Sequence, residues 1–120
     1  MELWKSIIIL EQSDMLVYKK KRPMKKTDNL KSPKQMERHL KGVANHRRIE
    51  ILFLIAREKG ITVERIAEKL DCNFKTVSEH TRRLVQAGLV KKNYSGRTVA
   101  HELLPYGRIF HNFIKTFQHS

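Results

Sequence analysis

The chain has 120 residues and carries 25 Lys and Arg against 12 Asp and Glu, a formal charge of +13. That length suits one domain with one modest core, and such a charge attracts polyanions, either nucleic acid or an anionic membrane surface. The single cysteine, Cys72, excludes an intrachain disulfide and fits a reducing compartment.

The apolar runs in the sequence are too short to span a bilayer. The longest, residues 51–56, is far below the roughly 20 residues that a membrane helix needs. The N-terminus also lacks the pattern of a secretory signal, because Glu2 and Lys5 interrupt it and no small-residue cleavage site follows. We therefore expect a cytoplasmic protein with no membrane partner.

Residues 1–31 are predicted to be an N-terminal extension ahead of a folded domain at residues 32–120. Residues 7–10 and 15–18 are apolar and flank a polar break, a pattern typical of a hairpin or of a short helix, and both remain open. Residues 19–33 are rich in Lys and Arg and poor in residues to bury, which predicts a flexible basic linker. Such a linker is a solvated tail, an arm that contacts phosphate, or a membrane-surface segment.

Four helices are predicted to follow, each opened by a side chain that can cap free backbone N–H groups. Ser32, ahead of Pro33, opens the first helix, which Gly42 is expected to break. The second runs from the cap Asn45 to Lys59, before a glycine. Thr62 caps a short third helix, and Asp71-Cys72-Asn73 form the turn that follows it. The fourth helix runs from the cap Asn73 to about Ala87-Gly88.

The apolar positions in these helices follow helical spacing. In the second helix they cover more than one stripe, which predicts burial on more than one side, in the core or in a subunit contact. In the other three helices they are Met36, Leu40 and Val43, then Ile66, Ala67 and Leu70, then Val77 and Leu84 with Thr81 and Val85 beside them.

Two strands and a last helix complete the chain. Residues 89–94 and 98–104 flank a tight turn, Ser95-Gly96-Arg97, which predicts a β-hairpin. Pro105 then permits a final helix from about residue 106 to residue 118, and its apolar residues include three Phe.

Two short helices joined by a tight turn and followed by a hairpin predict a winged helix-turn-helix. The fold class is therefore mainly α: a three-helix core plus a β-hairpin wing, with flanking first and last helices. Ala67 is small where the third and fourth helices must approach closely. In such a fold the fourth helix, residues 74–87, would enter the major groove of DNA, and the wing, residues 90–103, would contact the backbone or the minor groove.

Candidate DNA-binding residues lie on the outer face of the fourth helix and in the wing. Short polar side chains at the start of the helix suit readout on the groove floor, whereas the arginines further along suit phosphate contact. The helix contributes Lys75, Thr76, Ser78, Glu79, Arg82 and Arg83, and the wing contributes Lys91, Lys92 and Arg97, which are expected to cluster near its turn. Without a partner, the same wing would be a solvated hairpin.

Glu79 has two interpretations, because an acid repels phosphate. It either pairs with Lys75 or Arg83, one helical turn away on either side, or accepts a hydrogen bond from a cytosine amino group.

The segment from Leu40 to Leu104 resembles the ArsR-type winged-helix repressors. The resemblance rests on residues 43–52, 66–70, 76–80 and 84–90, which hold a Ser-x-His pair in the fourth helix and an Ala-Gly-Leu-Val sequence after it. It implies a homodimeric repressor with a dimer contact built by the first and last helices. It also implies that Ser78 and His80 belong to the DNA-reading helix.

Metal sensors of that family carry a cysteine pair or spaced histidines and carboxylates, and this chain departs from both patterns. Its only cysteine, Cys72, lies in the turn and is expected to be a small buried hydrophobe. His111 and His119 are eight residues apart, about 12 Å along a helix, which is too far for one tetrahedral zinc. A zinc site shared across a dimer by His101 and His111 is the alternative to ordinary histidines, and we expect no metal and no cofactor.

The sequence favours a sequence-specific transcriptional regulator, acting as a repressor on double-stranded DNA. The alternative is a winged-helix module that binds protein or RNA without sequence-specific DNA readout, because fold does not fix function. We do not expect an enzyme, since the sequence holds no Gly-rich phosphate loop, no paired carboxylates for a cleft, and no nucleophile with a base at compelling spacing.

Overall fold

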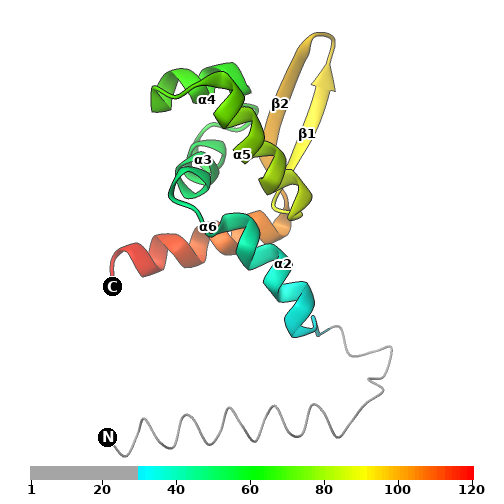
Figure 1. Ribbon diagram of the computed structural model, residues 1–120, viewed down its shortest axis with the longest axis vertical. Coiled ribbons are helices and arrows are strands. Elements are labelled where there is room, and N and C mark those ends of the chain that lie inside the picture. The colour runs from blue at the N-terminus through cyan, green and yellow to red at the C-terminus, as the bar shows by residue number, and fades with distance from the viewer. Residues whose placement is uncertain (1–29) are drawn as a thin grey trace, which may run out of the picture. The chain divides into compact units, whose positions relative to one another are not determined.

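The computed structural model describes residues 30–120, and Figure 1 shows how their helices and strands are arranged. The predictions for residues 1–29, which are the hairpin or short helix and most of the basic linker, lie outside the described residues. Ser32–Ser120 form one compact unit. In chain order its elements are α2 (Pro33–Val43), α3 (His46–Arg57), α4 (Val63–Leu70), α5 (Phe74–Gln86), β1 (Val90–Ser95), β2 (Thr98–Leu103) and α6 (Pro105–Gln118).

Side-chain caps open four of these helices, as the sequence predicts. Ser32 and Gln35 form a reciprocal capping box, in which the Ser32 hydroxyl accepts from the Gln35 backbone at 3.2 Å and the Gln35 side chain accepts from the Ser32 backbone at 2.9 Å. Asn45, Thr62 and Asn73 each accept from a backbone N–H in the first turn of α3, α4 and α5. The caps satisfy donors that have no partner inside the helix, and they therefore fix where each helix begins.

Two predicted helix ends are wrong. Gly42 does not break the first helix, because α2 continues through it and ends at Val43. A Cβ at Gly42 would collide with the side chain of Ala87, so this glycine lets α2 approach the end of α5 closely. The second helix, α3, ends at Arg57 rather than at Lys59.

The predicted turn between α4 and α5 forms at residues 71–73. Asp71 adopts the left-handed conformation, with a φ of 51°, and its backbone N–H donates to the Glu68 carbonyl at 3.2 Å, which closes α4. Cys72 is half-buried rather than buried, and it packs against the core. The turn orients α5 across α4, which is the helix-turn-helix arrangement.

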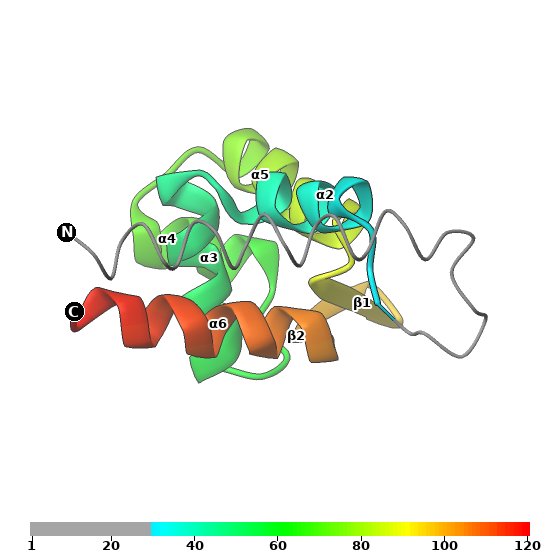
Figure 2. The same cartoon turned by 90° about the horizontal axis from the view of Figure 1, so that it is seen from below.

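The core is centred on α3, which packs between α5 and α6 (Figure 2). Ile51, Leu52, Leu54 and Ile55 of α3 are all buried, so the predicted burial of this helix on more than one side is confirmed. The apolar residues of the other elements that join them are Val43, Ile61, Ile66, Val77, Leu84, Ala87, Leu89 and Val90. Removing such side chains from water, at about 25 cal/mol per Å² of apolar surface, is the main force that holds the helices together.

The wing is an antiparallel hairpin in which Val90 lies opposite Leu103 at its base. β1 begins and ends one residue later than predicted, and β2 ends one residue earlier. Leu89 precedes β1; its side chain is fully buried, and its carbonyl accepts from the Leu104 backbone at 3.0 Å. A Cβ at Gly107 of α6 would collide with that same carbonyl, so the glycine allows α6 to pack directly under the base of the wing.

Apolar side chains on α2 and α6 remain exposed. Of the apolar positions predicted in the first helix, only Val43 enters the core, whereas Met36 and Leu40 are exposed. On α6, the exposed apolar residues are Tyr106, Ile109, Phe113 and Phe117. We call these six side chains of α2 and α6 the apolar face; exposed apolar side chains gathered in patches are typical of interaction surfaces. No helix within residues 30–120 is long and apolar enough to cross a membrane.

Candidate nucleic-acid interface

α5 has one buried face and one exposed polar face. Val77, Thr81 and Leu84 are buried, and the Thr81 hydroxyl is satisfied because it donates to the Val77 carbonyl at 2.8 Å. Ser78 is half-buried at the border between the two faces. The exposed side carries the other residues predicted from the outer face, which are Lys75, Thr76, Glu79, Arg82 and Arg83.

Glu79 forms ion pairs along its own helix. Its carboxylate accepts from Arg82 Nε at 2.9 Å and lies 3.3 Å from Arg83 Nε. The predicted ion pair with Lys75 or Arg83 is confirmed in its Arg83 form, and the sequence analysis did not consider Arg82. The hydrogen bond from Arg82 is the main cause that lowers the pKa of Glu79, so the residue is ionised and shields part of the positive charge of its helix.

His80 lies away from the exposed face of α5. It is half-buried, and its Nδ1 lies 3.4 Å from Nη1 of Arg48 on α3. Burial, followed by the charges of Arg48 and Arg83, lowers the pKa of His80. His80 therefore lies on α5 but contacts Arg48 of α3 rather than the solvent side of its own helix.

The predicted cluster of wing cations forms only in part, because Lys92 and Arg97 line one cleft and Lys91 does not. Lys91 and Lys92 lie at the base of the hairpin, opposite Glu102 and His101, while Arg97 lies at the tip. Successive residues of a strand point to opposite faces, so the two lysines diverge. Lys91 Nζ pairs with Glu102 at 3.0 Å, which neutralises part of its charge, whereas Lys92 points to the other face.

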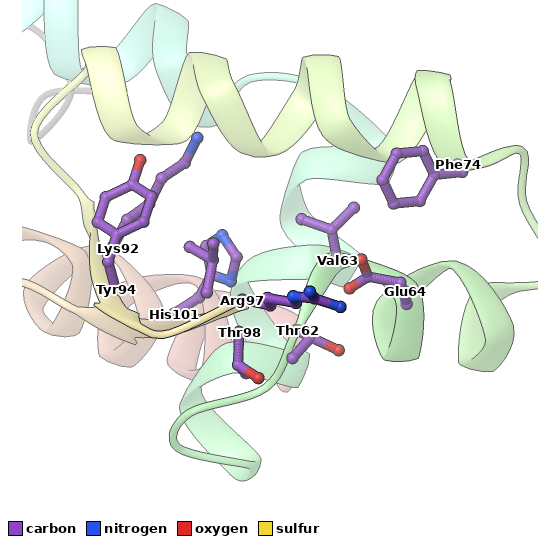
Figure 3. Close-up of a pocket in the computed structure, with 10 residues that line it drawn as sticks. Thr62, Val63, Glu64, Phe74, Lys92, Tyr94, Arg97, Thr98 and His101 are labelled. Atoms are coloured by element: carbon purple, nitrogen blue, oxygen red, sulfur yellow. The ribbon is translucent and has the colours of Figure 1, made fainter.

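A cleft of about 300 Å³ separates the wing from the first turns of α4 and α5. Figure 3 shows Phe74 at one end of this wing cleft, Lys92 and Tyr94 of the hairpin at the other, and Val63 and His101 between them. The cleft thus combines aromatic rings with cations beside the start of α5. Aromatic and cationic side chains in this combination suit bases and phosphates of nucleic acid.

His101 anchors the wing to the core. It is fully buried, and its Nδ1 lies 2.9 Å from the carbonyl oxygen of Ile61, to which its backbone N–H also donates at 3.1 Å. Because a carbonyl can only accept, Nδ1 carries the ring proton. Nε2 is buried and has no hydrogen-bond partner within the described part of the chain. Burial is the main cause that lowers the pKa of His101, which favours the neutral ring.

The same burial argues against the zinc alternative. A side chain that is enclosed within one subunit cannot coordinate a zinc ion that is also bound by a second subunit. His101 is fully enclosed. His111 instead packs edge-on against Phe53 of α3, with ring centroids 5.1 Å apart. Among residues 30–120, no group of three or more His, Cys, Asp or Glu side chains is close enough to hold a metal ion.

Several residues of this surface were missed by the sequence analysis. Phe74 and Tyr94 are exposed aromatic residues of the wing cleft, 51% and 73% accessible. Tyr94 could have been predicted because it lies two residues after Lys92 and therefore on the same face of β1. Phe74 could have been predicted because it directly follows the cap Asn73. Arg48, by contrast, reaches α5 from another helix, and no local pattern signals that contact.

Solved structures share this arrangement of helices and wing. The chain is similar to the homodimeric winged helix-turn-helix DNA-binding domain of a possible ArsR-family transcriptional regulator from Mycobacterium bovis, with 26% identity, a TM-score of 0.66, and coverage of 79% of this chain and 90% of that one. It is also similar to reduced HlyU from Vibrio cholerae, with 23% identity, a TM-score of 0.62, and coverage of 69% and 87%. An ArsR-like transcriptional regulator from Rhodococcus matches at 19% identity, with a TM-score of 0.57 and coverage of 67% and 74%.

The helices and wing thus form a winged helix-turn-helix similar to those of ArsR-type regulators, which confirms the predicted fold class and the predicted resemblance. A family model described as HVO_A0114 matches residues 43–111, more than half of the chain. The chain belongs to the HVO_A0114 family. No curated protein matches it in sequence.

Proposed function

We propose that the chain is a sequence-specific DNA-binding transcriptional regulator that acts as a repressor. The observation that carries the proposal is the exposed face of α5, where short polar side chains precede two arginines, together with the wing cleft that adjoins the start of the same helix. This order matches the division between base readout and phosphate contact. The similar Mycobacterium bovis domain is described as DNA-binding, which supports the same role here. The role is non-enzymatic, and we place it in the cytoplasm with the DNA.

In this proposal the DNA-reading helix, residues 74–87, lies in the major groove, and the wing, residues 90–103, lies on the backbone or in the minor groove. Base edges are read from the first half of α5, and phosphates are neutralised from its second half and from the wing tip. The base-reading residues are Lys75, Thr76 and Ser78, while Glu79 holds Arg82 and Arg83 through its ion pairs. The phosphate-binding residues are Arg82, Arg83, Lys92 and Arg97, with a smaller contribution from Lys91, which already pairs with Glu102, and an indirect one from His80 through Arg48.

We also infer that the regulator is a homodimer built by α2 and α6. The apolar face supports this inference, because Phe113 and Phe117 stack with ring centroids 6.0 Å apart and are more than half exposed. The His39 and Tyr106 rings, with centroids 5.0 Å apart, connect α2 to the start of α6. A second copy of the same face would bury these rings in a two-fold contact, and the similar Mycobacterium bovis domain is described as homodimeric.

Selection of bound sequences from a random duplex pool tests the proposed function. We expect enrichment of a near-palindrome whose half-sites are separated by about one helical turn, because a two-fold dimer presents two copies of α5. Competition with structured RNA at two salt concentrations distinguishes sequence-specific DNA binding from the alternative of an RNA-binding module. Preference for the RNA, or recovery of no common DNA sequence, would contradict the proposal.

A further inference from the structure

A second cavity, which we call the basic pocket, lies where α2, the start of α3 and the last turn of α5 meet. Its volume is about 300 Å³, and its lining includes Arg38, Lys41, Arg48 and Arg83 but no acidic residue. These four cations come from three helices and from positions 45 residues apart in the chain. The fold therefore gathers them, and local sequence does not.

Arg38 is held in place by the end of α5. Its Nε and Nη2 donate to the Gln86 carbonyl at 3.3 Å and 2.8 Å. The carbonyl end of a helix carries partial negative charge and repels anions. Because Arg38 covers that carbonyl, the wall of the basic pocket at the end of α5 is cationic.

Arg48 has spare hydrogen-bonding capacity next to this wall. Its Nη2 donates to the Lys41 carbonyl at 3.4 Å, and its Nη1 lies 3.4 Å from His80 Nδ1, both long contacts. Its Nε is buried without a hydrogen-bond partner in residues 30–120. No acidic side chain in that range forms an ion pair with Arg38 or Arg48. A guanidinium in this condition gains strongly from an added acceptor.

Carboxylates near the basic pocket neutralise it only in part. Glu37 lies 3.5 Å from Lys41, but both side chains are largely exposed, and Glu79 divides its charge between Arg82 and Arg83. The pKa of Arg48 is lowered, mainly by burial and then by the charge of Arg83. The second cause shows that the positive charges of Arg48 and Arg83 still repel each other. A bound anion would relieve that repulsion.

We propose that the basic pocket binds a phosphate-type oxyanion between Arg38, Lys41, Arg48 and Arg83. Arginine presents a planar fork of N–H donors that matches the oxygens of phosphate, and lysine adds a point charge. The phosphate belongs to the DNA backbone, since Arg83 lies on the helix that the proposed function places in the groove. This source rests on the proposed function, and a free phosphate compound is the other source of the same chemistry.

Titration with inorganic pyrophosphate tests the basic pocket without DNA. In heteronuclear NMR of the full chain, we expect saturable shifts of the Arg48 Nε–H and of the Gly42 and Ala87 amides. We also expect an upward shift in the pKa of His80, because the anion offsets the charge of Arg48. Lys41→Gln or Arg48→Gln should weaken pyrophosphate binding about tenfold, the loss expected for one charge-assisted hydrogen bond. The matched control is Lys34→Gln, an exposed lysine of α2 outside the pocket.

Salt dependence of DNA binding identifies the source of the phosphate. For a DNA phosphate, each of Lys41→Gln and Arg48→Gln reduces the slope of log K against log salt by about 0.9, and Lys34→Gln leaves it unchanged. Saturable pyrophosphate binding with an unchanged DNA slope would support the oxyanion site and assign it to a free phosphate compound. If the chain binds no DNA at all, the proposed function fails while the pyrophosphate titration still tests the site. Pyrophosphate shifts that do not saturate, or that persist unchanged in both variants, together with an unchanged DNA slope would overturn the proposal.

Discussion

Leu84 shows at the scale of one side chain how α5 is held on the core. It is fully buried within the apolar cluster, on the side of α5 opposite the polar face. Leu84→Ala should lower the free energy of unfolding by about 2–5 kcal/mol, because it removes packing and leaves a cavity. Urea denaturation measures this loss. Leu30→Ala, at a leucine 68% exposed, should change stability by less than about 0.5 kcal/mol, and equal losses in the two variants would show that Leu84 is not a core residue.

His101 makes stability depend on pH in a defined direction. The folded-state pKa of this ring lies below the value of about 6.5 expected in the unfolded chain. The unfolded chain therefore binds more protons as the pH falls, so the stabilisation is complete above about pH 6.5 and is lost as the pH falls through the folded pKa. Lys92 lowers that pKa further and Glu64 opposes it. We expect the free energy of unfolding to decrease between about pH 7 and pH 5.

The His101→Gln variant separates titration from packing. Glutamine keeps an N–H donor for the Ile61 carbonyl but has no charge to gain, so its stability should fall less steeply over this pH range, whatever its stability at pH 7. The pKa of His80 is also lowered, so a weaker slope should remain. The control His119→Gln, at an exposed position near the C-terminus, should keep the full slope. An unchanged slope in His101→Gln would contradict the assignment to this ring.

At the scale of elements, Gly42 sets how closely α2 approaches α5. Gly42→Ala places a Cβ against the Ala87 side chain, and we expect a loss of about 1–3 kcal/mol because two backbones must separate. In the double variant Gly42→Ala with Ala87→Gly, the loss of unfolding free energy should be smaller than the sum of the losses in the two single variants. The methyl group added at residue 42 then fills the space vacated at residue 87. Chemical denaturation of all four members of the cycle gives this coupling, and strict additivity would show that the two residues are not in contact.

α5 and the wing should contribute differently to DNA binding. Arg97→Ala, at the exposed wing tip, should weaken binding to all sequences and reduce the salt slope by about 0.9, because it removes one phosphate neutralisation. Lys91→Ala should have a smaller effect, since Glu102 already shares that charge. Thr76→Ala should instead change the preferred sequence. Fluorescence anisotropy on matched duplexes measures each effect, and a uniform loss in Thr76→Ala would contradict base readout by this residue.

At the scale of the whole molecule, the elements and most of the core follow from local sequence. Caps such as Asn45 and Asn73 act within one turn of chain, and burial of Val77 and Leu84 follows from helical periodicity, so both could be predicted. Gly42 was misinterpreted because a glycine that allows close packing and a glycine that stops a helix look alike in one sequence. The difference depends on a residue 45 positions away.

The candidate site was predictable only where it is carried by one element. The polar face of α5 follows from its periodicity, whereas the contact of Arg48 with His80 and the basic pocket depend on how three helices meet. The opposed directions of Lys91 and Lys92 follow from strand alternation, and their distance from the turn follows from the register, so this error was avoidable. Tertiary contacts of charged side chains are therefore the part that sequence reasoning could not supply.

The apolar face gives the last prediction, which concerns the assembled molecule. Phe113 is 61% exposed on the side of α6 away from the core, and in a two-fold contact it would be buried. Phe113→Asp should convert a dimer to a monomer in sedimentation equilibrium while the helical circular dichroism is unchanged, because a buried unpaired charge is costly at an interface but not in water. Affinity for a palindromic duplex should then fall, while affinity for one half-site should not. Asn112→Asp introduces the same charge one residue away on α6, at a position outside the apolar face, and should leave the dimer intact. A wild-type chain that sediments as a monomer, or a Phe113→Asp variant that stays dimeric, would exclude this face as the dimer contact.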